Sequence, residues 1–500
     1  MLRARQACRL ALWIFALAAT ALPFPGHAAV PLGEANARVL LTRLGFAPAS
    51  EDVAAFAGLT QTEAVDRLLY AAPAVQTPVP ESVRAAIPSH ADRHAMSEED
   101  RRTEHKKQVL ASYQLGAWWV QEMIVTPAPL RERMTLFWHN HFVSSEKKVK
   151  AARLLYEQNV LLRQQALGNF ATLLHAISKD PAMLIYLDSA TNRKGQPNEN
   201  FAREVMELFT LGEGHYTEQD IKEAARAFTG WSLDPQDYHF IFRRFTHDDG
   251  IKTVLGQRGN FDGDAVLDIL LAQPATAEFI VRKLWREFVS PTPDPAEVRR
   301  IAAVFRSSGY EIKPMLRALF NEPQLLAEDN RGTLVKSPIE LLVGTVRQFN
   351  LQYSDAAPFL WAARQSGQDL FDPPNVKGWP GGEAWINSAT LLMRKQQLEQ
   401  LFRAVERPAR QAQNQMRFQE DDDFKDARKQ MMLAARQIYF PADDWFRQWG
   451  TTLDRVPDAQ QLQRLEAVIL TLPPVNPLPA GATSLSVVRT LLLDPVYQLK

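Results

Sequence analysis

Cysteine is almost absent from this sequence, because Cys8 is the only one among its 500 residues. Cys8 lies within a predicted secretory signal, so we expect the mature chain to contain none. This excludes disulfides, a thiol nucleophile, iron–sulfur clusters, Cys-ligated zinc and c-type haem attachment. Any bound metal ion would therefore depend on His, Asp, Glu or backbone oxygen ligands.

An excess of one charge is also missing, since the chain carries 57 basic and 57 acidic residues. Removal of the predicted signal takes away Arg3, Arg5 and Arg9 and no acid, which leaves 54 − 57 = −3. A nearly neutral chain without blocks of Lys and Arg argues against nucleic acid or an anionic membrane as the main partner.

Long apolar runs are absent beyond a short one at residues 10–22. Three arginines precede that run and small residues follow it, which predicts a signal peptide at residues 1–28, cleaved after Ala28. The alternative is an uncleaved anchor. No later stretch reaches the roughly 18 apolar residues of a membrane helix. We therefore expect a Sec-exported protein of the periplasm or cell envelope, with no transmembrane span in the mature chain.

Familiar catalytic motifs are missing as well. The sequence holds no Gly-x-Ser-x-Gly, no His-Glu-x-x-His, no Walker loop and no dinucleotide-binding Gly-x-Gly-x-x-Gly. The sequence therefore does not favour a serine hydrolase, a zinc protease or a nucleotide-binding protein of the common types.

Helical periodicity dominates what remains and predicts a mainly α fold, a multi-helical orthogonal array. The exception is one minor β-hairpin near residues 240–255, with Asp249 and Gly250 as its tight turn. We expect a single large domain over residues 29–500, made of a core over about 37–394 and a C-terminal helical extension over about 395–500. Residues 407–426 are strongly charged and predict a solvated helix or linker.

The most informative stretch, residues 198–231, reads NENFAREVMELFTLGEGHYTEQDIKEAARAFTGW. It predicts two capped helices separated by a turn. Gly212 is placed to end the first helix, and Thr217 begins the second with a capping-box pattern.

That stretch and five further motifs, in the same order, closely resemble the bacterial family called domain of unknown function 1800 (DUF1800). The resemblance implies an exported, largely helical protein and covers about residues 37–394, with a return at 491–499. Such proteins are frequently encoded beside an exported family, domain of unknown function 1501 (DUF1501), which is similar to sulfatases and alkaline phosphatases. A DUF1501 protein is therefore the implied partner. The other motifs are LLTRLGFAP (40–48), RERMTLFWHNHFVSS (131–145), HDDGIKTVLG (247–256), KSPIE (336–340) and PPNVKGWPGGEAWIN (373–387).

His139 and His141 are the first candidates for metal ligands. On a helix they point in directions about 200° apart, so they chelate one ion only if the helix ends at His139. Met134, Phe137, Trp138 and His141 share one apolar stripe. The structural alternative therefore places His141 in the core and His139 near the surface.

Carboxylates supply the remaining candidates. Glu204 borders the apolar face of the first signature helix, either as a general base or as half of a buried ion pair with Arg226. Glu199, with Asp188 as a further possibility, would face the histidines. His247 and Asp248 would complete the site, or would simply satisfy turn geometry.

The Pro/Gly/Trp loop at residues 371–388 carries the last candidates. Trp379 and Trp385, with Asn375 and Asn387, have the residue types of a sugar-binding platform. Tryptophans in such loops also act as plugs that fix the loop to the core.

Two functions remain open. The first is an accessory envelope protein that binds a partner protein or a polymeric ligand through loop 371–388. The second is a metal-dependent hydrolase with a divalent ion, Glu204 and His141 as catalytic groups, and a ligand set drawn from the side chains of His139, His141, Glu199, His247 and Asp248.

Overall fold

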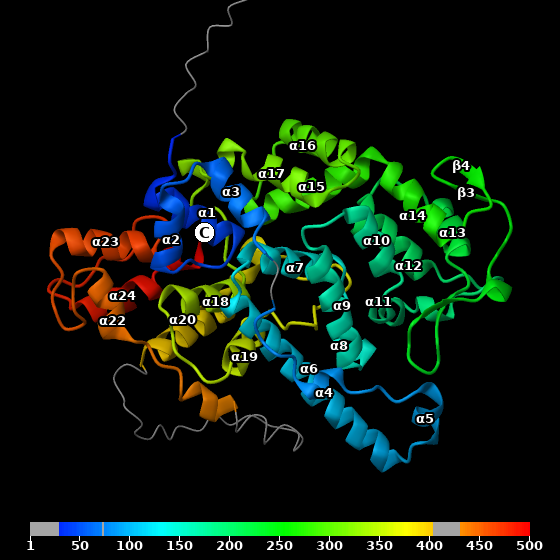
Figure 1. The fold of residues 1–500 in the computed structure, drawn as a ribbon, viewed down its shortest axis with the longest axis horizontal. Helices are drawn as coiled ribbons and strands as arrows, with labels where there is room; N and C mark the ends of the chain where they lie inside the picture. The colour runs from blue at the N-terminus through cyan, green and yellow to red at the C-terminus, as the bar shows by residue number, and fades with distance from the viewer. Residues whose placement is uncertain (1–29, 73–74, 404–430) are drawn as a thin grey trace, which may run out of the picture.

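The computed structural model describes residues 30–72, 75–403 and 431–500. The predicted signal at 1–28 and the charged segment at 407–426 lie outside these ranges. The described chain is mainly α, as predicted, and its helices spread into a broad, flattened body (Figure 1). Two small two-stranded sheets accompany the helices within the described part of the chain.

The first half of the chain consists almost entirely of helices. In chain order they are α1 (Gly33–Leu44), α2 (Ser50–Ala57), α3 (Gln61–Leu69), α4 (Glu81–Arg84), α5 (His90–Ala95), α6 (Glu98–Val125), α7 (Pro129–His141), α8 (Glu146–Val149), α9 (Ala152–Gln165), α10 (Phe170–Ser178), α11 (Pro181–Tyr186), α12 (Glu199–Glu204) and α13 (Glu218–Ala227).

The second half is again helical after the small sheets. Its helices are α14 (Gly263–Ala272), α15 (Pro274–Phe288), α16 (Pro295–Ser307), α17 (Ile312–Phe320), α18 (Pro338–Gln348), α19 (Ala357–Gln365), α20 (Ser388–Arg403), α22 (Ala442–Gln448), α23 (Ala459–Ile469) and α24 (Ser484–Leu493).

The apolar core consists of two clusters of buried side chains. One cluster joins α1–α3, α7 and α10–α17, and the other joins α6, α18–α20 and α22–α24. The second cluster combines Trp119 and Phe371 with Phe440, Trp445 and Leu491 from the C-terminal segment. The described residues of the predicted C-terminal extension therefore pack into the same core as the earlier helices.

Local sequence signals explain the signature helices. Thr217 caps α13, because its side chain accepts a hydrogen bond from the backbone N–H of Asp220. In return, the Asp220 carboxylate accepts a hydrogen bond from the Thr217 N–H. Gly212 has φ +80°, a conformation that favours glycine, and so ends the first helix. The periodicity did not indicate that α12 continues as a π-helix over Val205–Thr210, labelled η2. Such segments often occur at functional sites.

The single hairpin predicted for residues 240–255 is wrong in its pairing. β2 (Phe240–Phe242) pairs antiparallel with β1 (Trp231–Leu233), and β3 (Lys252–Val254) pairs with β4 (Gln257–Gly259). The turn between β3 and β4 is Leu255-Gly256, both with positive φ as a tight hairpin turn requires. The Asp249–Gly250 pair instead ends a loop stabilised by Arg226, so side-chain contacts replaced the expected strand pairing.

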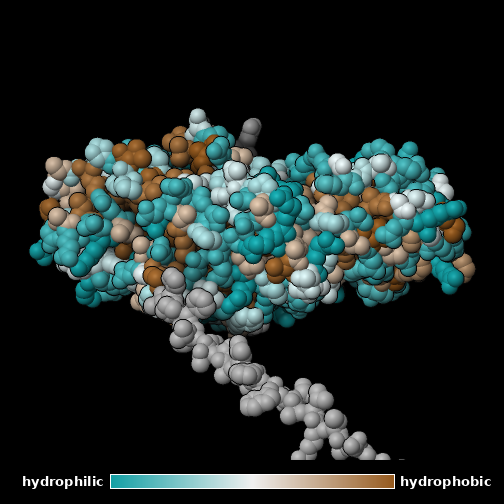
Figure 2. All heavy atoms as spheres, turned by 90° about the horizontal axis from the view of Figure 1, so that it is seen from above, coloured by the Kyte–Doolittle hydropathy of each residue, from teal (hydrophilic) through white to brown (hydrophobic). Residues whose placement is uncertain are grey.

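The surface seen in Figure 2 is mainly hydrophilic, with small separate apolar patches and no continuous apolar band on that face. Among the described helices, none combines the length and the apolar character that a membrane crossing requires.

Candidate functional site

His139 and His141 lie in the last turn of α7, and both side chains are buried, with 1% and 2% exposure. The predicted core position of His141 is confirmed. The surface position expected for His139 is wrong, because Trp119 of α6 and Phe371 and Trp379 of loop 371–388 cover its ring. Contacts from distant parts of the chain bury the face of α7 that the helical pattern predicted to be exposed.

His139 serves as a neutral hydrogen-bond acceptor. Its Nε2 accepts a hydrogen bond of 3.3 Å from the backbone N–H of Phe371. Burial lowers the pKa of His139 to about 3, since the charged ring would lose its hydration. Phe371 has φ +66°, an unfavourable conformation for a non-glycine residue. The His139 ring therefore helps to hold a strained residue in place.

His141 has partners on both ring nitrogens. Nε2 lies 3.1 Å from the carbonyl oxygen of Phe209 in the π-helix, and Lys283 Nζ lies 2.8 Å from Nδ1. A carbonyl accepts and an ammonium donates, so Nε2 carries the proton and Nδ1 accepts. Burial and the charge of Lys283 lower the pKa of His141, and burial lowers the pKa of Lys283 to about 8.

The carboxylates proposed to join the histidines lie apart from them. Glu204 is buried, but its expected partner Arg226 pairs instead with Asp248 and Glu223, so the Glu204–Arg226 pair is wrong. Burial and the nearby Glu207 raise the pKa of Glu204, and the charge of Lys377 partly opposes this effect. Glu204 is therefore a buried carboxyl group whose charge interacts with those of Glu207, Lys377 and Arg203.

Glu199 and Asp188 are surface residues. Glu199 lies in the first turn of α12 with its side chain 3.7 Å from Arg203. Asp188 forms an exposed ion pair of 2.6 Å with Lys148. Among the described residues, neither forms a hydrogen bond or an ion pair with His139 or His141, so geometry gives them no shared role with the histidines.

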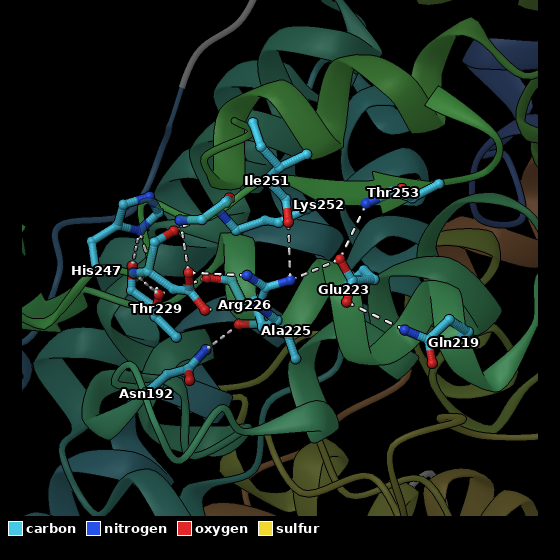
Figure 3. Close-up of polar contacts among 12 residues, drawn as sticks. Asn192, Gln219, Glu223, Ala225, Arg226, Thr229, His247, Ile251, Lys252 and Thr253 are labelled. Atoms are coloured by element: carbon cyan, nitrogen blue, oxygen red, sulfur yellow. Dashed lines mark hydrogen bonds and ion pairs between the residues drawn. The ribbon is translucent and has the colours of Figure 1, made fainter. Parts of the chain in front are cut away.

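His247 and Asp248 belong to a separate network around Arg226 (Figure 3). His247 Nδ1 lies 2.7 Å from the carbonyl oxygen of Thr229. Arg226 donates to both oxygens of Asp248, at 2.7 and 3.1 Å, and this lowers the pKa of Asp248 to about 2. The turn-geometry interpretation accounts for both residues, because their polar atoms are occupied by the neighbouring backbone and Arg226.

The predicted metal-ligand set is thus not brought together. Within the described ranges, the one group of at least three His or acidic side chains with ligand atoms inside 4.8 Å of one another is Asp234, Asp237 and His239. These residues lie between β1 and β2 on the surface, and no ligand candidate of the sequence analysis is among them. Helix position alone could not reveal that His139, His141 and His247 each face a different element.

Loop 371–388 is pinned to the core by its tryptophans. Trp379 and Trp385 are buried, with 4% and 8% exposure, which matches the plug interpretation and leaves no flat aromatic platform. Asn140 of α7 accepts from the Trp379 N–H at 2.7 Å and donates to its carbonyl oxygen at 3.1 Å. The two remaining candidates, Asn375 and Asn387, are exposed, and their side chains accept from backbone N–H groups of the loop and of α20.

Three carboxyl groups near Phe371 were missed by the sequence analysis. Asp369 pairs with Arg364 at 3.1 Å, and Asp372 pairs with Lys147 at 2.6 Å. Glu146 begins α8, and its backbone N–H donates to the Phe371 carbonyl oxygen at 2.8 Å. The sequence did contain an indication, since Glu146 directly follows the motif at 131–145 and Asp372 directly precedes the motif at 373–387. Only the fold, however, brings residues 146 and 369 together.

Comparison with known proteins supports one assignment. No curated protein and no solved structure matches the chain. The family described as "Protein of unknown function (DUF1800)" matches residues 39–499, which includes all the motifs above and nearly all of the two apolar clusters. The chain therefore belongs to the DUF1800 family.

Proposed function

We propose that this protein is an exported accessory protein of the cell envelope that binds a partner protein through loop 371–388. The observation that carries the proposal is the way this loop is held. Its backbone is fixed to the core at several points, while most of its polar side chains face outward.

The anchors of the loop are spread along its length. His139 accepts from the N–H of Phe371, Asn140 holds Trp379 from both sides, and the Thr390 hydroxyl donates to the Trp385 carbonyl at 2.9 Å. Lys377 reaches Glu207 of the π-helix at 3.5 Å and Glu213 at 3.3 Å. A loop fixed in this way loses little conformational entropy on binding, which favours recognition.

The outward residues of the loop form a mainly polar surface. They are Pro374, Asn375, Lys377, Pro380, Gly382, Glu383, Ala384, Asn387 and Ser388. Buried tryptophans give the loop stiffness, and this exposed set gives it chemical specificity. The first partner to test is an exported DUF1501 protein, as the family resemblance implies.

The rival, a metal-dependent hydrolase, is less well supported. Its ligands would have to lose their present interactions. His139 accepts a hydrogen bond from the Phe371 N–H, His141 accepts one from Lys283, and Asp248 forms an ion pair with Arg226. The hydrolase hypothesis is tested by measuring the metal content of protein purified from the exported form without a His tag or chelators. One tight equivalent that disappears in His139→Gln or His141→Gln would favour the hydrolase over our proposal.

Site-specific photocrosslinking in the native envelope tests the partner proposal. A photoreactive residue at Asn375 or Glu383 is expected to capture one defined protein, and the same residue at the exposed Arg299 of α16 is not. Purified partner should then bind Glu383→Lys about tenfold more weakly, at an unchanged thermal midpoint, because a recognition surface has acquired the wrong charge. The same capture from all three positions, or none from the loop, contradicts the proposal.

A further inference from the structure

Phe245 lies in the middle of a short 3-10 turn, η3 (Arg244–Thr246), and its side chain is 92% exposed. No other large apolar side chain among the described residues has a larger exposed fraction. The turn belongs to the end of the flattened body that carries α13, β3 and β4 (Figure 1). Single apolar residues at a surface are common, so the meaning of Phe245 depends on what surrounds it.

The backbone around Phe245 is held in place. The N–H of His247 donates to the Arg244 carbonyl oxygen at 3.1 Å, and the Phe242 ring packs edge-on against the His247 ring, with 5.3 Å between ring centres. His247 is itself buried. The turn therefore presents Phe245 from a fixed base, which keeps the entropic cost of a contact low.

Four exposed cationic side chains accompany this turn: Arg193, Lys194, Arg243 and Arg244. The N–H of Lys194 donates to the Thr246 carbonyl oxygen at 2.8 Å, which fixes the first pair beside η3. The second pair directly precedes Phe245 in the chain. The sequence holds no block of Lys and Arg, but the fold assembles one from these two separate dipeptides.

The four cations form no ion pair within the described part of the chain. Arg193 donates to the Gln196 amide oxygen at 2.9 Å, and Arg243 donates to the Ser232 hydroxyl at 3.1 Å, so both partners are neutral. The other two side chains form no hydrogen bond with described residues. Cations that are exposed and unpaired remain available to an anionic partner.

The acids nearest along the chain do not neutralise this charge. Asp188 pairs with Lys148, and Asp248 pairs with Arg226. Asp249 is exposed and has no ion pair, so the four cations and this one acid leave a local charge of 4 − 1 = +3. Charges farther away than about 10 Å are largely screened at 0.1 M salt. The local excess, rather than the nearly neutral total, therefore determines which partners approach this end of the molecule.

We propose that the Phe245 patch, defined as Arg193, Lys194, Arg243, Arg244 and Phe245, docks this protein on a bilayer that contains anionic phospholipids. The cations contact the headgroups, and the Phe245 ring enters the interface between headgroups and acyl chains. The patch uses no residue of loop 371–388.

A lipid surface fits the patch better than an acidic protein does. A protein partner would need a pocket shaped for a ring that projects almost completely, because aromatic anchors bind in fitted pockets. A bilayer accepts such a ring at any point. Its mobile headgroups also suit cationic side chains that have no fixed partner.

The first test is co-sedimentation of the full mature protein with two kinds of vesicle, one of phosphatidylcholine alone and one of phosphatidylcholine and phosphatidylglycerol in equal parts. Each cation near an anionic surface strengthens binding about fivefold, so the mixed vesicles should bind at least about tenfold more tightly. Raising NaCl from about 0.1 to about 0.5 M should remove most of this difference, because salt screens the charges.

A pair of charge reversals tests the basic part of the patch. Lys194→Glu combined with Arg244→Glu should weaken binding to the mixed vesicles at least about a hundredfold. The matched control combines Arg299→Glu with Arg306→Glu, two exposed arginines of α16 outside the patch, and changes the total charge equally. The control should bind at least about tenfold more tightly than the patch variant.

Phe245→Ser tests the apolar part. This variant should bind the mixed vesicles about tenfold more weakly, since the ring no longer leaves water. Val475→Ser is its control, because Val475 is 71% exposed and lies outside the patch, and it should bind as wild type does. All the replaced side chains are exposed, and an unchanged thermal midpoint verifies that each variant is folded.

The proposal is overturned if wild type binds neither vesicle, if it binds both equally, or if the α16 control loses as much affinity as the patch variant. The first of these results would assign the patch to an acidic protein instead. The vesicle comparison needs no variant, so it decides the matter even if a variant fails to fold. None of these measurements involves residues 375 or 383, so failure here is distinguishable from failure of the partner proposal.

Discussion

At the scale of single residues, burial converts chemically suggestive side chains into structural ones. His139 and His141 are neutral because desolvation lowers their pKa values, and each ring accepts or donates to a specific neighbour. Lys283 is an unusual partner, since its half-buried ammonium donates to an imidazole nitrogen. The cost of losing a partner at this site depends on which group remains.

Replacement of His141 should therefore destabilise the protein more than replacement of Lys283. In His141→Leu, both the Phe209 carbonyl and the Lys283 ammonium lose their partners, and we expect a loss of about 3 kcal/mol in the free energy of unfolding. In Lys283→Met, only the His141 Nδ1 acceptor is left, and about 1 kcal/mol is expected. Urea unfolding measures both, and the reverse order contradicts the assigned hydrogen bonds.

Replacement of Glu146, unlike that of His141 or Lys283, should stabilise the protein. Its pKa of about 7 lies above the ordinary value, so the folded state holds a proton that the unfolded state releases. The stability of the wild type should therefore decrease as the pH rises from about 4.5 through 7. Glu146→Gln should be more stable than wild type above pH 7, by at most about 2 kcal/mol because solvent screens a half-buried group. Equal pH profiles of the two proteins in thermal unfolding contradict this.

At the scale of elements, a side-chain network replaces the strand pairing expected from the sequence. Arg226 of α13 holds Asp248, and Glu223 of the same helix accepts from the N–H of Thr253 in β3 (Figure 3). The alternating apolar pattern of residues 240–255 predicted strands correctly but not their partners. β3 packs against α13 and pairs with β4, while β2 pairs with β1.

Asp248→Asn should loosen the β3–β4 hairpin without unfolding the remainder. We expect a loss of about 1 kcal/mol for this partly exposed pair, and faster amide hydrogen exchange confined to residues 252–259. Arg226 lowers the pKa of Asp248 to about 2, so its contribution is present above the ordinary pKa of 3.8 and disappears as the pH falls toward 2. Uniformly faster exchange in α7 and α13 would show that the network has a wider role.

At the scale of the whole molecule, one buried ionic cluster joins the two apolar clusters. Arg133 of α7 lies 2.8 Å from Glu340 of α18 and 2.7 Å from Glu287 of α15, and the Lys500 ammonium also contacts Glu340. The Arg133 guanidinium lies over Phe288 of one apolar cluster and Phe46 of the other. These contacts couple the C-terminal segment to the central helices.

Glu340→Gln should consequently have the largest effect of any substitution considered, about 3 kcal/mol or more, because Arg133 and Lys500 remain buried with less compensation. The cations lower the pKa of Glu340 to about 2, so its contribution is present above pH 4.5 and is lost as the pH falls toward 2. Scanning calorimetry should show one transition at lower temperature. The exposed Asp444→Asn, which loses only a surface pair with Arg447, should change stability by less than about 0.5 kcal/mol.

The sequence by itself determined whatever depends on near neighbours along the chain. Helical periodicity, the Thr217 capping box and the helix end at Gly212 could all be predicted, because each requires only residues within a few positions. The mainly α class and the family followed from such local signals in a fixed order. The placement of Glu146 near Asp369, and the different partners of His139 and His141, were decided only by tertiary structure. Those contacts join residues more than 60 positions apart, and burial, which sets their charge, exists only after the helices pack.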